Sequence, residues 1–167
     1  MKLLPCRNHT LNQHRHQHLR SGQPPQTGVF TAALLRRGIP PVHISAIEAS
    51  AGFAAELEKR FPEVVVIHGD AVRVRHIVRC GSGSAGVIIC GLPLLSMPPV
   101  KVLRIVAGCM AILRPDGELR LFTYGFRCPI PASILSRLGL IARHRTFVPL
   151  NMPPASVYAV QRKSTNA

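Results

Sequence analysis

Hydrophobic and polar positions follow two different periods along the chain after residue 27, and the two periods alternate. Short apolar runs rich in Val and Ile predict β-strands at 42–47, 64–67 and 86–90. Longer segments with apolar positions three or four residues apart predict helices at 31–37, 50–60, 71–79 and 100–113. Strands that alternate with helices are typical of an α/β domain with a mostly parallel sheet.

The last third of the chain has a different pattern. Residues Glu118–Tyr124 alternate between the two faces of a strand, and a short helix is expected at 131–138. Two more strands, at 140–148 and 156–162, are predicted to form an antiparallel hairpin at the edge of the sheet. By contrast, the unbroken apolar run at 64–67 is typical of a strand in the buried centre of a parallel sheet.

The pattern indicates one domain in a chain of 167 residues. All the predicted strands and helices lie within residues 27–162. The segment 1–26 is basic and rich in His, with no hydrophobic period and no acid, and we predict that it is disordered. Residues 163–167 are predicted to be a second disordered tail.

Charge is distributed unevenly along the chain, whose formal net charge is +14. All seven acidic residues lie between Glu48 and Glu118, so the excess of Lys and Arg belongs to the two ends. Basic ends are attracted to phosphate, either of nucleic acid or of anionic lipid. The alternative is an Arg-rich composition without a function of its own.

Cysteine spacing and hydropathy limit the class of protein further. The five cysteines are scattered without the spacing of a metal site, so we expect no bound metal and a reducing, cytoplasmic environment. The cluster His14-x-His16-x-His18 is read as part of a polar tail rather than as a metal ligand set. No apolar run approaches the ~18–20 residues that cross a bilayer, so any contact with the inner membrane face would be peripheral.

Candidate functional residues cluster at the predicted carboxyl ends of the strands. In an open parallel sheet, ligands bind beyond these ends, so four short segments are expected to meet in one crevice. They are Glu48-Ala49, Gly69-Asp70-Ala71, Cys90-Gly91-Leu92-Pro93-Leu94 and Thr123-Tyr124-Gly125. Glu48 would accept hydrogen bonds from ribose hydroxyls, and Asp70 would reach a base, cap the following helix, or do both. The helix start at Thr27-Gly28 would add free backbone N–H groups.

These segments resemble the bacterial S-adenosylmethionine-dependent methyltransferases of class I, and among them the phospholipid N-methyltransferases, which methylate phosphatidylethanolamine. The motifs that carry the resemblance are TGVFTAALL, AIEAS, HGDA, GLPLLSMPP, LRPDGELRLFTYG and PPASVYAVQRK. The resemblance covers about residues 27–162 and implies a Rossmann-like fold, S-adenosylmethionine as cofactor, and a lipid head group as partner at a membrane surface.

The resemblance also implies roles for particular residues. The residues expected to bind the cofactor are Thr27, Gly28, Glu48, Ala49, Asp70, Ala71 and Cys90. The residues expected to form the methyl-transfer site are Gly91, Leu92, Pro93, Leu94 and Tyr124. Tyr124 is alternatively a packing residue at the end of a strand. Basic side chains that would face lipid phosphates are Arg127, Arg137, Arg143 and Arg145, with a solvated surface as the alternative reading.

The chain departs from the family just before Thr27. Where the family has an apolar first strand and a glycine loop, this chain has residues 19–26 with neither. We therefore expect the first strand to be missing from the centre of the sheet, between the strands at 42–47 and 86–90, and the cofactor to bind weakly. Two alternative functions stay open: methylation of adenine N6 in ribosomal RNA or another nucleic acid, and an inactive methyltransferase-like protein. The first is disfavoured because Leu94 offers no aromatic face for stacking a base.

Overall fold

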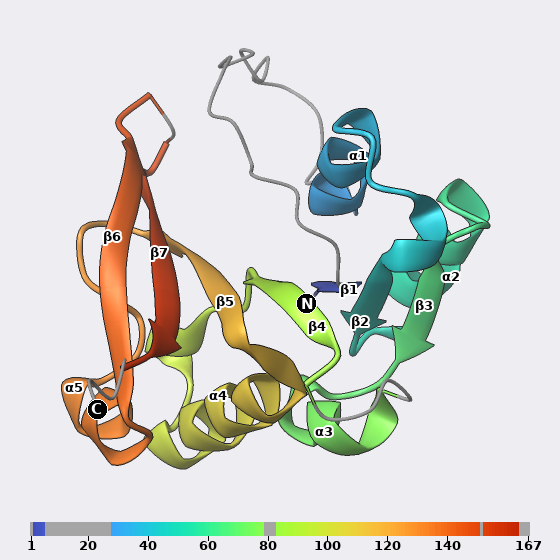
Figure 1. Cartoon of the computed structure of the whole chain (residues 1–167). Helices are drawn as coiled ribbons and strands as arrows, with labels where there is room; N and C mark the ends of the chain where they lie inside the picture. Colours follow the sequence, from blue (N-terminus) through green and yellow to red (C-terminus); the bar gives the residue numbers. More distant parts are fainter. Residues whose placement is uncertain (1, 6–27, 79–82, 151, 164–167) are drawn as a thin grey trace.

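The computed structural model describes residues 2–5, 28–78, 83–150 and 152–163 as one seven-stranded sheet with helices on both faces (Figure 1). The strand order is β3-β2-β1-β4-β5-β7-β6. The strands are β1 (Lys2–Pro5), β2 (Ser45–Glu48), β3 (Val65–His68), β4 (Ala85–Cys90), β5 (Leu113–Tyr124), β6 (Leu140–Val148) and β7 (Ala155–Arg162). The helices are α1 (Val29–Arg36), α2 (Ala51–Arg60), α3 (Val74–Ile77), α4 (Pro99–Ile112) and α5 (Ala132–Arg137). Three short 3₁₀ turns are η1 (Pro41–His43), η2 (Ala71–Arg73) and η3 (Leu94–Ser96).

The class of the fold and the edge hairpin are as predicted. Strands β2 and β3 pair in parallel, as do β4 and β5, and helices connect them. Strands β6 and β7 form an antiparallel hairpin that pairs with β5 through β7, so that β6 is the edge strand. The alternation predicted for the end of β5 is also confirmed, since Leu119, Leu121 and Thr123 are buried and Tyr124 is exposed.

The centre of the sheet corrects one prediction. Strand β1 lies between β2 and β4, antiparallel to both, with Lys2 opposite Ala46 on one side and Ile89 on the other. Residues 2–5 are therefore ordered in a strand, whereas 6–27 lie outside the described residues. The physical reason is that the facing edges of β2 and β4 carry backbone groups that need partners, and the extended backbone of Lys2–Pro5 lies between them. The sequence correctly indicated that the family's first strand would be missing between β2 and β4, but it did not predict that residues 2–5 would take that place.

Two further expectations about strands are wrong. Strand β3 is an edge strand rather than a central one, and Val65 within it is 50% exposed. An unbroken apolar run is therefore found both in a central strand that is buried on its two faces and in a short edge strand such as β3, which packs against α2. The run alone does not distinguish the two. The run 42–47 begins with the 3₁₀ turn η1 and becomes a strand only at Ser45, because Pro40 and Pro41 fix the backbone in turn geometry.

The sheet separates two apolar clusters. On one face, α1 and α2 pack on β2 through Leu34, Ala46 and Leu57. On the other face, α3, α4 and α5 cover a larger core that contains Ile88 and Leu119. These two layers fix the carboxyl ends of β2, β3 and β4 at one rim of the sheet, which is where a functional site is expected.

Candidate functional site

A cavity of about 220 Å³ lies at the carboxyl rim, between the ends of β2 and β3 and the first half of α4. Its walls are mostly apolar, with two carboxylates and one ammonium group among them. The residues that line it are Ile47, Glu48, Ala49, Gly69, Asp70, Ala71, Val72, Leu92, Met97, Lys101 and Ile105. A cavity with apolar walls and a few converging charges has the character of a small-molecule site.

Glu48 is positioned by the junction between β2 and α2. It is the last residue of β2, and its Oε1 accepts a hydrogen bond from the backbone N–H of Ser50 at 3.2 Å. Ser50 in turn caps α2 by accepting from the N–H of Phe53, as its sequence position predicted. The carboxylate is therefore held by its own loop, and its remaining lone pairs are available to a ligand that donates hydrogen bonds.

Asp70 occupies the equivalent position after β3. Its Oδ1 accepts from the N–H of Val72 at 2.9 Å, so Asp70 caps η2 and one of the two predicted roles is confirmed. The side chain is exposed and also lines the cavity, which leaves the second carboxylate oxygen open to a ligand. Because β2 and β3 are adjacent and parallel, with Glu48 opposite His68, the two carboxylates lie on neighbouring strand ends.

Helix α4 supplies the wall that sequence reasoning missed. Lys101 and Ile105 are four residues apart in α4, so they lie on one face of the helix, and both line the cavity together with Met97, which precedes the helix in extended backbone. Pro98 and Pro99 signal the helix start. The four-residue spacing of Lys101 and Ile105 predicts that they share one face of a helix, but it does not predict that this face meets the cavity.

The cavity unites some of the predicted residues and leaves others apart. Its lining includes Glu48, Ala49, Asp70, Ala71 and Leu92. Among the described residues, other predicted site residues lie outside that lining: Gly28, Cys90, Gly91, Pro93, Leu94 and Tyr124. Thr27 lies outside the described residues. The first three of the four predicted segments therefore meet, and the segment 123–125 does not line the cavity.

Two of these residues have evident packing roles. Gly28 precedes α1 with φ of 89°, and a Cβ there would lie 2.6 Å from Cε2 of Phe61, so glycine is required for the close approach of α1 to α2. Cys90 is 1% exposed, and this burial raises the pKa of its thiol. Their predicted contacts to a cofactor stay predictions.

A row of aromatic side chains begins one residue beyond the cavity. Gly91 follows β4 next to Leu92, and a Cβ on Gly91 would lie 3.1 Å from Cε2 of Phe30. The Phe30 ring meets Phe122 edge-on at a centroid distance of 6.2 Å, and Phe122 meets Tyr124 at 5.4 Å. Tyr124 is thus linked to the cavity rim through two phenylalanines.

The described residues provide neither a cluster of metal ligands nor a membrane-spanning helix. No group of three His, Cys, Asp or Glu side chains lies close enough together there to hold a metal ion. Within those same segments, no helix has the length and apolar character needed to cross a membrane.

No protein-family model matches the chain, and no curated protein matches it in sequence. Solved structures do match. The PH0226 protein of Pyrococcus horikoshii is 12% identical, with a TM-score of 0.59 over 82% of this chain and 78% of that one. The 1,6-didemethyltoxoflavin-N1-methyltransferase of Burkholderia thailandensis, solved with bound 1,6-didemethyltoxoflavin and S-adenosylhomocysteine, is 17% identical, with a TM-score of 0.62 over 83% of this chain and 68% of that one. An S-adenosylmethionine-dependent methyltransferase of Archaeoglobus fulgidus is 10% identical, with a TM-score of 0.60 over 82% of both chains.

At these identities the similarity establishes the fold. The chain has the α/β, Rossmann-like fold of the class I methyltransferases, with parallel strand pairs and an antiparallel edge hairpin.

Proposed function

We propose that this protein is an S-adenosylmethionine-dependent methyltransferase whose acceptor is the amine of phosphatidylethanolamine. The observation that carries the proposal is the cavity at the carboxyl rim, with Glu48 and Asp70 on adjacent parallel strand ends. The fold shared with methyltransferases, two of them described as using or binding this cofactor or its product, supports the same reading.

The residues around the cavity fit the nucleoside part of the cofactor. Glu48 would accept from ribose hydroxyls, Asp70 would accept from the exocyclic amine of adenine, and Ala71 and Leu92 would contact the base. The cavity volume of about 220 Å³ is below the roughly 300–1,000 Å³ of sites for whole drug-sized ligands, which suits one part of the cofactor. When bound, the cofactor supplies an electrophilic methyl group on its sulfonium.

The chain's own contribution to the reaction is alignment and exclusion of water. The segment Gly91–Leu94 would form an apolar wall beside the acceptor, with backbone carbonyls to accept from its amine. Such positioning is worth up to about 7–11 kcal/mol of barrier. The amine attacks only when it is unprotonated, and entry into an apolar site lowers its pKa by disfavouring the charged form.

Contact with a membrane surface is supported by the exposed apolar side chains near the β6–β7 hairpin. Leu150 and Met152 are almost fully exposed, and Phe126 stacks on Phe147 at a centroid distance of 4.6 Å. Strand β6, which includes Phe147, also carries Arg143 and Arg145. Exposed apolar groups beside basic ones suit the boundary between lipid head groups and acyl chains.

A second candidate, a methyltransferase-like protein without activity, is favoured by the direction of β1. This strand is antiparallel to β2 and β4, so its amino-terminal end lies at the carboxyl rim where the family has a glycine loop. The close backbone approach that such a loop provides is then not supplied by β1. We accordingly expect weak cofactor binding by this chain.

Calorimetric titration with S-adenosylmethionine and S-adenosylhomocysteine tests the cofactor site. Glu48→Gln should weaken binding by about tenfold, since a hydrogen bond to a charged group is lost, whereas Glu58→Gln on the exposed face of α2 should not. Equal binding by both variants would count against the site.

Transfer of radiolabelled methyl groups tests the acceptor. We expect label in vesicles that contain phosphatidylethanolamine, and none in matched vesicles of phosphatidylcholine. Label in RNA instead would favour the nucleic-acid alternative, and no label in any acceptor would favour the inactive protein.

A further inference from the structure

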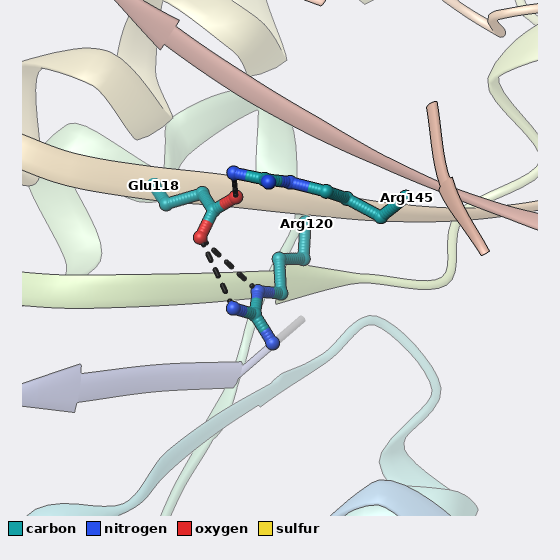
Figure 2. Close-up of polar contacts among 3 residues, drawn as sticks. All are labelled: Glu118, Arg120 and Arg145. Atoms are coloured by element: carbon teal, nitrogen blue, oxygen red, sulfur yellow. Dashed lines mark hydrogen bonds and ion pairs between the residues drawn. The ribbon is translucent and has the colours of Figure 1, made fainter. Parts of the chain in front are cut away.

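The carboxylate of Glu118, which is largely buried, holds two arginines, Arg120 and Arg145 (Figure 2). Oε2 of Glu118 accepts from Nη2 of Arg120 at 3.1 Å and from its Nε at 3.3 Å. Its Oε1 accepts from Nη2 of Arg145 at 3.5 Å. The carboxylate side chain is 12% exposed, whereas the side chains of Arg120 and Arg145 are 34% and 49% exposed. The acid thus lies underneath, and the two guanidinium groups face outward.

The three charges do not cancel. Two guanidinium groups on one carboxylate leave a net positive charge, and each guanidinium keeps N–H donors that no described residue uses. Two oriented guanidinium groups with spare donors match the geometry of a phosphate group, which accepts several hydrogen bonds at once. Holding the long side chains in advance also lowers the entropy that a ligand must overcome.

The fold explains how residues on two separated strands meet. Strand β7 lies between β5 and β6, and its Ala159 is opposite Arg120 on one side and Arg143 on the other. The small side chain of Ala159 leaves room for an arginine to reach across β7. The register of β6 shifts between His144 and Thr146, so Arg145 is the extra residue of a bulge, and bulges commonly redirect a side chain.

The arginine pair lies next to the aromatic row, because both include residues of β5. Arg120 and Phe122 are two residues apart on β5 and so share one face, about 7 Å apart along the strand. Cys90 pairs with Leu121, which places Gly91, the next residue of the predicted methyl-transfer segment, beside Phe122. The ring faces of Phe122 and Tyr124 can attract a cationic or partly charged amine.

We propose that Glu118 positions Arg120 and Arg145 as a binding site for the phosphate group of the methyl acceptor. The acceptor then lies along β5, with its phosphate on the arginine pair and its amine at Phe122, toward Gly91. The identity of the phosphate compound as the methyl acceptor rests on the proposed function, but the binding of phosphate by this pair does not.

Calorimetric titration of the full chain with O-phosphoethanolamine, inorganic phosphate and ethanolamine tests the site. Arg120→Gln and Arg145→Gln should each weaken binding of the two phosphate compounds by about tenfold, and ethanolamine should bind far more weakly than O-phosphoethanolamine. The matched control is Arg36→Gln, which removes one exposed charge at the end of α1 and should bind as the wild type does. Phosphate binding that both β-strand variants retain would overturn the proposal, even if their melting temperatures fall.

Glu118→Gln separates positioning from simple attraction. The substitution raises the net charge by one, so a site that works by charge alone would bind phosphate more tightly. A site that depends on the carboxylate to hold the arginines would bind phosphate more weakly, which is the expected result. Tighter binding would overturn the positioning role of Glu118.

Vesicles of phosphatidylethanolamine distinguish a lipid phosphate from a soluble one, and arginine-dependent binding of either compound supports the site. The two proposals can fail separately. If the wild type transfers no methyl group but binds O-phosphoethanolamine through the arginine pair, the proposed function fails and the phosphate site stands. If methyl transfer occurs and both arginine variants match the wild type in binding and in KM, the phosphate site fails.

Discussion

The guanidinium group of Arg162 donates a hydrogen bond of 2.7 Å to the backbone carbonyl of Arg114, which joins the end of β7 to the start of β5. The same side chain donates to the carbonyls of Leu113, at 3.2 Å, and Met110. Met110 lies in the last turn of α4 and Leu113 directly follows the helix, where a helix leaves acceptors without intrahelical partners. Arg162 thus caps α4, and a cation there also suits the helix dipole.

This cap should contribute substantially to stability. Arg162→Met removes the donors while keeping an apolar stem, and we expect the free energy of unfolding to fall by about 2–3 kcal/mol. Arg162→Lys should lose part of that amount, because an ammonium group cannot serve several carbonyls with one planar fork. Urea denaturation measures both, with Arg36→Gln as the exposed control; an unchanged midpoint in Arg162→Met would contradict the capping role.

A glycine in the middle of α4 is required for the packing of α3. A Cβ on Gly108 would lie 2.6 Å from Cγ1 of Val74, so Gly108→Ala should destabilise the protein by about 1–2 kcal/mol despite the better helix propensity of alanine. Gly52→Ala in α2 is the matched control, because the nearest atom to its new Cβ is 3.9 Å away. We expect it to stabilise the protein by up to about 1 kcal/mol. Thermal unfolding would disprove the clash if the two variants behaved alike.

The central place of β1 predicts a strong effect of proline there. Leu3 lies opposite Ser45 and Ile88, and a proline at this position removes a backbone N–H from the ladder. Leu3→Pro should lower the free energy of unfolding by about 3 kcal/mol or more, whereas Leu3→Val, which keeps the N–H, should cost far less. Hydrogen exchange of the β2 and β4 amides should accelerate only in the proline variant. If both variants exchange equally, β1 does not hold the sheet together.

The buried thiols should make stability depend on alkaline pH. Burial raises the pKa of Cys90, Cys109 and Cys128 above the ordinary value. The unfolded chain releases these protons near pH 8.5 while the folded chain retains them, so the stabilisation present below that pH is lost above it. At one pH unit above the unfolded pKa, a thiol that stays protonated in the folded chain costs up to about 1.4 kcal/mol, which we expect for the fully buried Cys109.

Urea denaturation between pH 7.5 and 9.5 measures this slope, and Cys90→Ala should make it shallower by the share of one thiol. A slope identical to that of the wild type would show that Cys90 does not contribute to the pH dependence of stability.

At fixed pH, half-buried Cys128 should react with iodoacetamide before fully buried Cys90 and Cys109 do, as peptide mapping by mass spectrometry can establish.

Local rules predicted most of the helices, the edge hairpin and the caps. The cap of α2 by Ser50 and the alternation along β5 depend only on neighbouring residues, so they can be read from short windows. The position of β3 depends on which strands lie beside it, and its four apolar residues carry no such information. For the same reason, the tetrapeptide Lys2–Pro5 gave no sign that it pairs with strands more than forty residues away.

The candidate site was predictable where it follows strand ends and not where it depends on tertiary contact. Glu48 and Asp70 end predicted strands, and both line the cavity. Lys101 lines it because α4 packs against the rim, and Arg145 meets Glu118 only through a bulge and a small residue on the intervening strand. Neither relationship has a local pattern, since each joins segments far apart in the chain.

Strand β1 also sets the order in which the molecule can assemble. Its four residues are synthesised well before their partners, because the β2 partners lie more than forty positions later and Ile89 in β4 lies more than eighty positions later. Until then the centre of the sheet stays open, and the exposed edges of β2 and β4 can pair with other chains. Closure of so distant a contact is slow, so we expect the nascent protein to need protection by a chaperone until β1 inserts between β2 and β4.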